Sequence, residues 1–139
     1  MDDLYREQLL DQYKHPRNHG TLDPCDAGAE GQNPLCGDEV SITLTFDDDR
    51  IGAIRFTGHG CAVSQAATSM LTELVDGMGV EEAAAVASEA ILEELGIPLS
   101  PMRVKCAVLG LGTLKVALHR ARGTALPPEW GDADEMVWS

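Results

Sequence analysis

The hydrophobic period of this sequence changes at Cys61, and this change restricts the fold more than any other feature. From 40 to 46, apolar residues alternate with Ser and Thr, which is the period-two pattern of a half-buried strand. A polar turn over 47–50 and a return strand over 51–60 complete an antiparallel hairpin. From Cys61 onward the apolar spacing is that of a helix. A hairpin joined directly to a helix predicts an α+β arrangement.

One helix is predicted before the hairpin and one directly after it. In the first, Tyr5, Leu9 and Tyr13 recur every four residues, and Pro16 ends the helix. The second starts at Cys61 and ends at Gly77. Its apolar stripe is Val63, Ala67, Met70, Leu71 and Leu74.

Two further helical segments follow. The segment 80–95 is expected to break near Ser88, which can cap its second half. The last helix is predicted over 102–122 and stops at Gly123. The fold class expected from this order is α+β, with a small antiparallel sheet and helices packed on one face.

The length of the chain limits the number of domains, and its charge limits the classes of binding partner. The 139 residues suit one domain over 1–123, followed by an acidic, Pro-containing tail over 124–139. With 23 acidic and 10 basic residues, the formal charge of −13 repels phosphate backbones and anionic lipids. We therefore expect neither nucleic acid nor a membrane as partner, and a basic protein surface fits better. No apolar run approaches the roughly 20 residues that span a bilayer, and the acidic N-terminus does not resemble a signal peptide.

We expect a cytoplasmic protein, in which thiols stay reduced and cysteines serve metal or sulfur chemistry. Cys36, Cys61 and Cys106 each lie at a boundary between predicted elements. Cys61 opens a helix, and Cys106 is expected near the start of the last helix, directly after Lys105. A helix N-terminus and a neighbouring cation both favour thiolate. Plain packing remains the alternative for each cysteine taken alone.

Asp38 stands two residues after Cys36, across Gly37, and can turn toward the same centre. Three cysteines and one aspartate differ from the usual structural zinc set of Cys and His, and a carboxylate is the weakest of these ligands for a soft metal. Cys25 lies in a Pro/Asp/Gly loop and is interpreted as a bystander.

The sequence resembles the U-type iron–sulfur assembly family, the group containing SufU and IscU. The segments that carry the resemblance are "LYREQLLDQYKHPRNHGTL", "NPLCGD", "FTGHGCAVSQAATSMLTELVDG" and "MRVKCAVLGLGTLKVAL". The resemblance implies a three-stranded antiparallel sheet, with one more strand between 20 and 35. It also implies that one site binds zinc or a nascent [2Fe-2S] cluster, through Cys36, Asp38, Cys61 and Cys106.

The resemblance further implies a scaffold or sulfur acceptor, not an enzyme, apart from a sulfurtransferase-like step at Cys36. A cysteine desulfurase of the SufS or IscS type would deliver persulfide sulfur, and apo iron–sulfur proteins would receive the cluster. Lys105 resembles SufU, and the short spacing between Cys61 and Cys106 resembles IscU. "SPMRVKC" replaces the segment that binds a DnaK-type chaperone in IscU, so that partner is not expected. A zinc sulfur carrier, a cluster scaffold, a purely structural zinc site and a zinc hydrolase stay open as alternatives.

Overall fold

The computed structural model describes residues 2–33, 37–96 and 99–122. It contains three strands in one antiparallel sheet of order β1-β2-β3, and five helices among these residues. The α+β class and the third strand are therefore confirmed. The elements are α1 (Asp2–Lys14), β1 (Ala27–Asn33), β2 (Asp38–Asp47), β3 (Arg50–His59), α2 (Ala62–Val75), α3 (Val80–Ala84), α4 (Ser88–Leu95) and α5 (Pro101–Arg122).

The β2–β3 hairpin forms the centre of the sheet, as its alternating pattern predicts. On β2, Val40, Ile42 and Leu44 are buried on one face. Asp38 is the first residue of β2 and lies two positions before Val40, so its side chain is buried on this face as well. On β3, Ile54 and Phe56 share the buried face, as expected.

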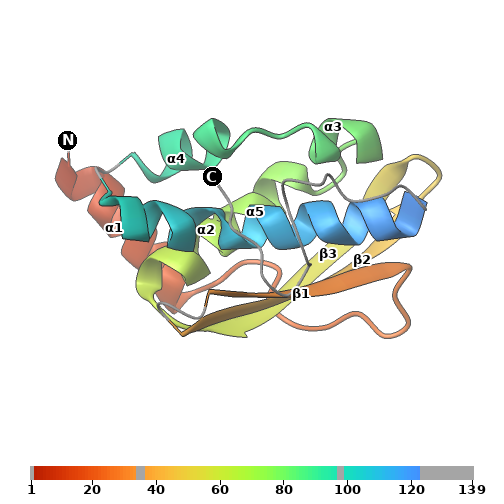
Figure 1. The fold of residues 1–139 in the computed structure, drawn as a ribbon, viewed down its shortest axis with the longest axis horizontal. Helices are drawn as coiled ribbons and strands as arrows, with labels where there is room; N and C mark the ends of the chain where they lie inside the picture. Colours follow the sequence, from red (N-terminus) through yellow and green to blue (C-terminus); the bar gives the residue numbers. More distant parts are fainter. Residues whose placement is uncertain (1, 34–36, 97–98, 123–139) are drawn as a thin grey trace.

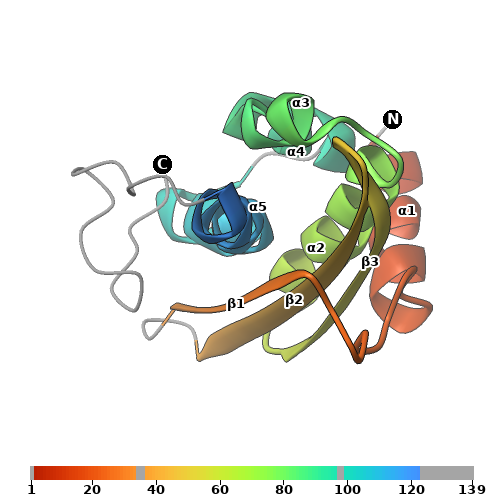
Figure 2. The ribbon, with the colours of Figure 1, turned by 90° about the vertical axis from the view of Figure 1, so that its right-hand side faces the viewer.

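The helices form layers above one face of the sheet (Figures 1 and 2). Figure 2 shows α2 and α5 lying in the concave side of the curved sheet, with α1 beside α2. α3 and α4 pack on α5 from the side away from the sheet. The prediction that helices cover one face of the sheet is confirmed.

Two close approaches fix α5 between the sheet and α2. A Cβ atom on Gly31 of β1 would overlap Thr113 Oγ1, so the backbone of β1 touches α5 there. A Cβ atom on Gly110 would lie 2.5 Å from Thr68 Oγ1 of α2. Both glycines therefore let α5 approach its neighbours closely, and this sets the position of the residues along α5.

The structure corrects the predicted stripe of α1. Leu9 is buried against the core, but Tyr13 is 43% and Leu10 is 40% exposed. Gln12 takes the inward position instead, and its side chain binds Ser69 and Glu73 of α2. A polar partner on α2 thus rotates α1 away from the orientation that its apolar residues alone favour.

Two further helix predictions need correction. In α2, Ala67, Met70 and Leu71 are buried as expected, whereas Leu74 is 36% exposed. Segment 80–95 does break, into α3 and α4, but Ser88 is not the cap. Ala87 is the N-cap of α4, without a side-chain hydrogen bond, and Ser88 is already helical. Gly96 ends α4 in the left-handed conformation at φ 66.

No helix among the described residues is long and apolar enough to cross a membrane. The predicted tail over 124–139 lies outside the described residues, so its separation from the domain stays a prediction.

Candidate metal centre

Three metal-ligating side chains meet at one end of the sheet. One ligand atom from each of Asp38, Cys61 and Cys106 lies within 4.8 Å of the other two. Asp38 starts β2, Cys61 stands directly before α2, and Cys106 belongs to α5. Cys61 and Cys106 follow Asp38 by 23 and 68 positions in the sequence, and the hairpin and α5 bring the three residues together. The predicted convergence of these three residues is present in the structure.

Asp38 and Cys61 are joined by hydrogen bonds. The Cys61 backbone N–H donates to Asp38 Oδ1 at 2.7 Å. The other carboxylate oxygen, Oδ2, lies 3.7 Å from Cys61 Sγ. Asp38 is fully buried, so this carboxylate needs such donors in place of water. One carboxylate oxygen thus accepts from the backbone, and the other faces the thiol.

Cys61 is the N-cap of α2. Its sulfur accepts a hydrogen bond from the Ser64 backbone N–H at 3.4 Å. The unpaired N–H groups and the positive end of the helix dipole lie at this position, and both stabilise negative charge on sulfur. The predicted helix-start environment is therefore present for Cys61.

Cys106 lies near the start of the last helix, as predicted, but one turn into it. Cys106 lies in the second turn of α5, which starts at Pro101, and its side chain is fully buried. The unpaired N–H groups of a helix belong to its first turn, whereas this sulfur belongs to the second turn of α5. Lys105 is exposed. Sequence reasoning also missed Asn33, whose side-chain nitrogen lies 3.8 Å from Cys106 Sγ.

Gly60 lets the backbone approach the site closely, as expected for the glycines before Cys61. It has φ 140, and a Cβ atom there would overlap Asp38 Oδ1 and lie 2.8 Å from Asp38 Cα. Only glycine lets the end of β3 pass this closely over the carboxylate. The signal in the sequence was the pattern of glycines directly before Cys61.

The remaining candidates divide into two groups. Cys36, the predicted sulfur acceptor and fourth ligand, lies outside the described residues. Cys25 is exposed, and the residue that follows it bonds to Leu44 O, far along β2 from Asp38. His59 is exposed and pairs with Glu39 Oε2 at 2.8 Å. Within the described part of the chain, neither Cys25 nor His59 belongs to the ligand cluster.

The donor set suits a soft or borderline metal. Two thiols and a carboxylate are typical ligands of zinc and iron, whereas calcium and magnesium prefer oxygen donors alone. A tetrahedral zinc ion with Zn–S bonds of about 2.3 Å holds its ligand atoms about 3.5–3.8 Å apart. The 3.7 Å between Cys61 Sγ and Asp38 Oδ2 matches this spacing. These residues therefore fit zinc or an iron centre.

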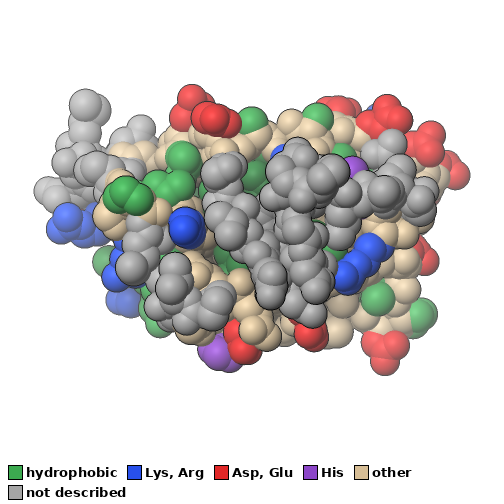
Figure 3. Space-filling view, in the orientation of Figure 1, with side chains coloured by type: hydrophobic (Ala, Val, Ile, Leu, Met, Phe, Trp, Pro, Cys, Tyr) green, Lys and Arg blue, Asp and Glu red, His purple; other side chains and the backbone are tan. Residues whose placement is uncertain are grey.

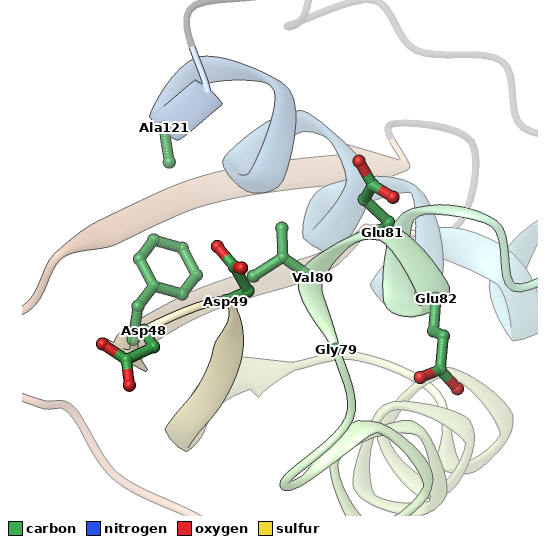
Figure 4. Close-up of a pocket in the computed structure, with 8 residues that line it drawn as sticks. Asp48, Asp49, Gly79, Val80, Glu81, Glu82 and Ala121 are labelled. Atoms are coloured by element: carbon green, nitrogen blue, oxygen red, sulfur yellow. The ribbon is translucent and has the colours of Figure 1, made fainter.

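The opposite end of the hairpin holds a hollow of about 520 Å³. Figure 4 shows carboxylates from the β2–β3 turn and from α3 around it. Acidic side chains gather at this end of the surface, on the right in Figure 3. The lining residues are Phe46, Asp48, Asp49, Gly79, Val80, Glu81, Glu82 and Ala121. The four carboxyl groups are exposed and bring no soft donor with them, so this hollow is not a matching metal site.

Known proteins resemble the whole domain. The chain is 38% identical over 138 residues to the iron–sulfur cluster assembly scaffold protein IscU of Streptococcus pyogenes, covering 87% of this chain and 86% of that protein. It is 31% identical over 140 residues to the zinc-dependent sulfurtransferase SufU of Bacillus subtilis, covering 88% of this chain and 95% of that protein.

A solved structure supports the same grouping. It is described as a candidate iron–sulfur cluster assembly scaffold of the SUF system, from Fervidobacterium islandicum AW-1. It superimposes with a TM-score of 0.73 at 34% identity, and the match covers 81% of this chain and 94% of that chain. The family model of the NifU-like N-terminal domain matches residues 4–125. With the fold, the family model and these relatives in agreement, the chain belongs to the family of NifU-like N-terminal domains that includes IscU and SufU.

Proposed function

We propose that this protein accepts sulfur from a cysteine desulfurase and assembles an iron–sulfur cluster for transfer to apo-proteins. One observation carries the proposal: Asp38, Cys61 and Cys106 converge within 4.8 Å at the end of the sheet that Cys36 directly precedes in sequence. The names of the relatives, a cluster scaffold and a zinc-dependent sulfurtransferase, support the same chemistry.

The proposed sulfur step takes place at Cys36. Its thiolate attacks the terminal sulfur of the desulfurase persulfide, the S–S bond breaks, and the desulfurase cysteine leaves as a thiolate. One sulfur atom moves and Cys36 becomes the persulfide, without net oxidation or reduction. Conversion of this sulfur to cluster sulfide takes two electrons, which an external thiol or a reductase must supply together with ferrous iron.

The described residues have distinct proposed roles. Cys61 and Cys106 are the fixed ligands, because one caps α2 and the other is buried within α5. Asp38 is the exchangeable ligand, since oxygen binds a soft metal less tightly than thiolate does. Zinc is the proposed resting ion: it suits a thiolate-rich site, and it protects the thiolates from oxidation.

The proposed partners follow from this chemistry and from charge. A cysteine desulfurase must bring its persulfide to the open end of the β2–β3 hairpin, and a basic surface on it would match the net charge of −13. Apo iron–sulfur proteins are the proposed acceptors. We place both partners and the protein in the cytoplasm, where thiols stay reduced.

The test combines metal analysis with sulfur labelling. Protein purified anaerobically should contain about one zinc per chain. After incubation with an active desulfurase and ³⁵S-cysteine, label should appear on the peptide that contains Cys36. The Cys36→Ser variant should take up none, and Cys25→Ser, the matched control, should be labelled like the unmodified protein.

Each alternative gives a different result. A purely structural zinc site predicts bound zinc without any label. A zinc hydrolase predicts hydrolytic turnover of model esters by the zinc-loaded protein and no label. Label on Cys61 or Cys106, with an active desulfurase, would contradict the assignment of Cys36.

A further inference from the structure

Asn33 is the last residue of β1, and it lies on the core face of the sheet. In the antiparallel register it stands directly opposite Asp38. Its side chain is buried, with 8% exposure. An amide in this position has left water and must direct its N–H groups to acceptors within the protein.

The Asn33 amide reaches the sulfur of Cys106. Nδ2 lies 3.8 Å from Cys106 Sγ, within the range of an N–H···S hydrogen bond. Cys106 is fully buried, so bulk water does not solvate negative charge on its sulfur. A nearby donor therefore matters more at this sulfur than it would at an exposed one.

The other two ligands of the cluster also accept N–H groups, but from the backbone. Ser64 N–H donates to Cys61 Sγ at 3.4 Å, and Cys61 N–H donates to Asp38 Oδ1 at 2.7 Å. Both of these donors belong to the start of α2. Cys106 lies inside α5, where backbone N–H groups are used within the helix, and the N–H donor to its sulfur seen among the described residues is the Asn33 side chain.

We propose that Asn33 is a positioning residue for the metal centre, which acts by donating an N–H···S hydrogen bond to Cys106. The bond orients the sulfur toward Asp38 and Cys61, and it withdraws electron density from the sulfur. Hydrogen bonds to ligand sulfurs set the reduction potential of iron–sulfur clusters, and partners of metal ligands contribute to affinity. This proposal rests on the proposed metal site.

Co²⁺ is the probe for this bond, because sulfur-to-cobalt charge-transfer bands report the electron density on each sulfur. Two variants remove the N–H donor. Asn33→Leu keeps the approximate volume, and Asn33→Ala does not. Gln32→Leu, on the exposed neighbour of Asn33, is the matched control. We expect both Asn33 variants to shift the charge-transfer bands to lower energy and to weaken Co²⁺ binding about tenfold. Gln32→Leu should match the unmodified protein.

The cluster reconstituted on the two Asn33 variants should also have a lower reduction potential than the cluster on the unmodified protein. Unchanged charge-transfer energies in both variants, with Co²⁺ bound, would overturn the role of Asn33. A shift in Asn33→Ala alone would also overturn it, since the lost volume would then be the cause. If the unmodified protein binds no Co²⁺, the proposed metal site itself fails.

Discussion

The two ends of the β2–β3 hairpin carry acidic residues in opposite settings. At one end, Asp38 is fully buried, bonded to the Cys61 backbone, and close to two thiols. At the other, Asp48 and Asp49 are exposed beside a hollow of about 520 Å³. The end with the hollow has more carboxylates, yet of these two ends only the one at Asp38 combines soft donors with burial.

This difference shows which features identify a site of this kind. Exposed carboxylates keep their water and cost little to place anywhere on a surface. A buried carboxylate is expensive unless something compensates its charge, so Asp38 calls for a specific explanation. The start of α2 supplies part of that compensation, and the proposed metal ion would supply more.

The largest expected effect is that of metal removal. A ligand that binds only the folded state stabilises by about 4 kcal/mol when present at about 1,000 times its Kd. Chelation should therefore lower the Tm of the zinc-loaded protein by roughly 15 °C. Hydrogen exchange should speed up at the start of α2 and stay unchanged at the 47–50 turn. Equal loss of protection at the start of α2 and at the 47–50 turn would contradict the placement of the metal at the Asp38 end of the hairpin.

Loss of one thiol ligand should come next. In Cys106→Ser, roughly a quarter of a zinc-binding free energy of about 10–16 kcal/mol should be lost, which is about 2.5–4 kcal/mol. Zinc affinity should fall about 100-fold or more in a competition assay with a chromophoric chelator. The double variant Asp48→Asn, Asp49→Asn should bind zinc like the unmodified protein. A comparable loss in this double variant would place metal ligands at the wrong end.

Gly60→Ala tests the close contact over Asp38. Gly20 is a matched control, because it has the same φ of 140 and a Cβ atom there would have no neighbour within 4 Å. Both alanine variants carry the backbone cost of positive φ, on the order of 1–3 kcal/mol. In urea unfolding, the free energy of unfolding of Gly60→Ala should fall by about 2 kcal/mol more than that of Gly20→Ala. The zinc affinity of Gly60→Ala should fall as well. Equal losses in both variants would show that Asp38 tolerates displacement.

The smallest effect is expected for Cys25→Ser. Cys25 is exposed and lies outside the ligand cluster of the described residues. The free energy of unfolding should change by less than about 0.5 kcal/mol, and the zinc content not at all. Metal loss in this variant would mean that the site uses a different set of cysteines.

Much of this architecture could be predicted from the sequence, because most elements have a clear period. The strands of the hairpin follow from alternation, and the same alternation places Asp38 on the core face two residues before Val40. β1 could not be found in this way: its sequence, AGAEGQN, has little strand propensity. It is held instead by pairing with β2 and by the contact of Gly31 with Thr113.

The candidate site was predicted in part for the same reason. Sequence order places Cys61 before a helix and Cys106 near the start of α5, but it does not show that the Cys106 side chain is fully buried. Asn33 was missed because its partner is 73 residues away. Contacts of this range depend on how α5 packs on β1, which local periodicity does not encode.

The two Asp38 oxygens face different groups of Cys61, and this makes the Cys61 amide proton a reporter for the site. Oδ1 accepts from Cys61 N–H, while Oδ2 faces the thiol. Any change in the charge or orientation of the carboxylate must alter the magnetic environment of the Cys61 amide. In a ¹⁵N-labelled sample, this one resonance should follow ligand exchange at Asp38, and the signals of Asp48 and Asp49 should serve as an internal reference.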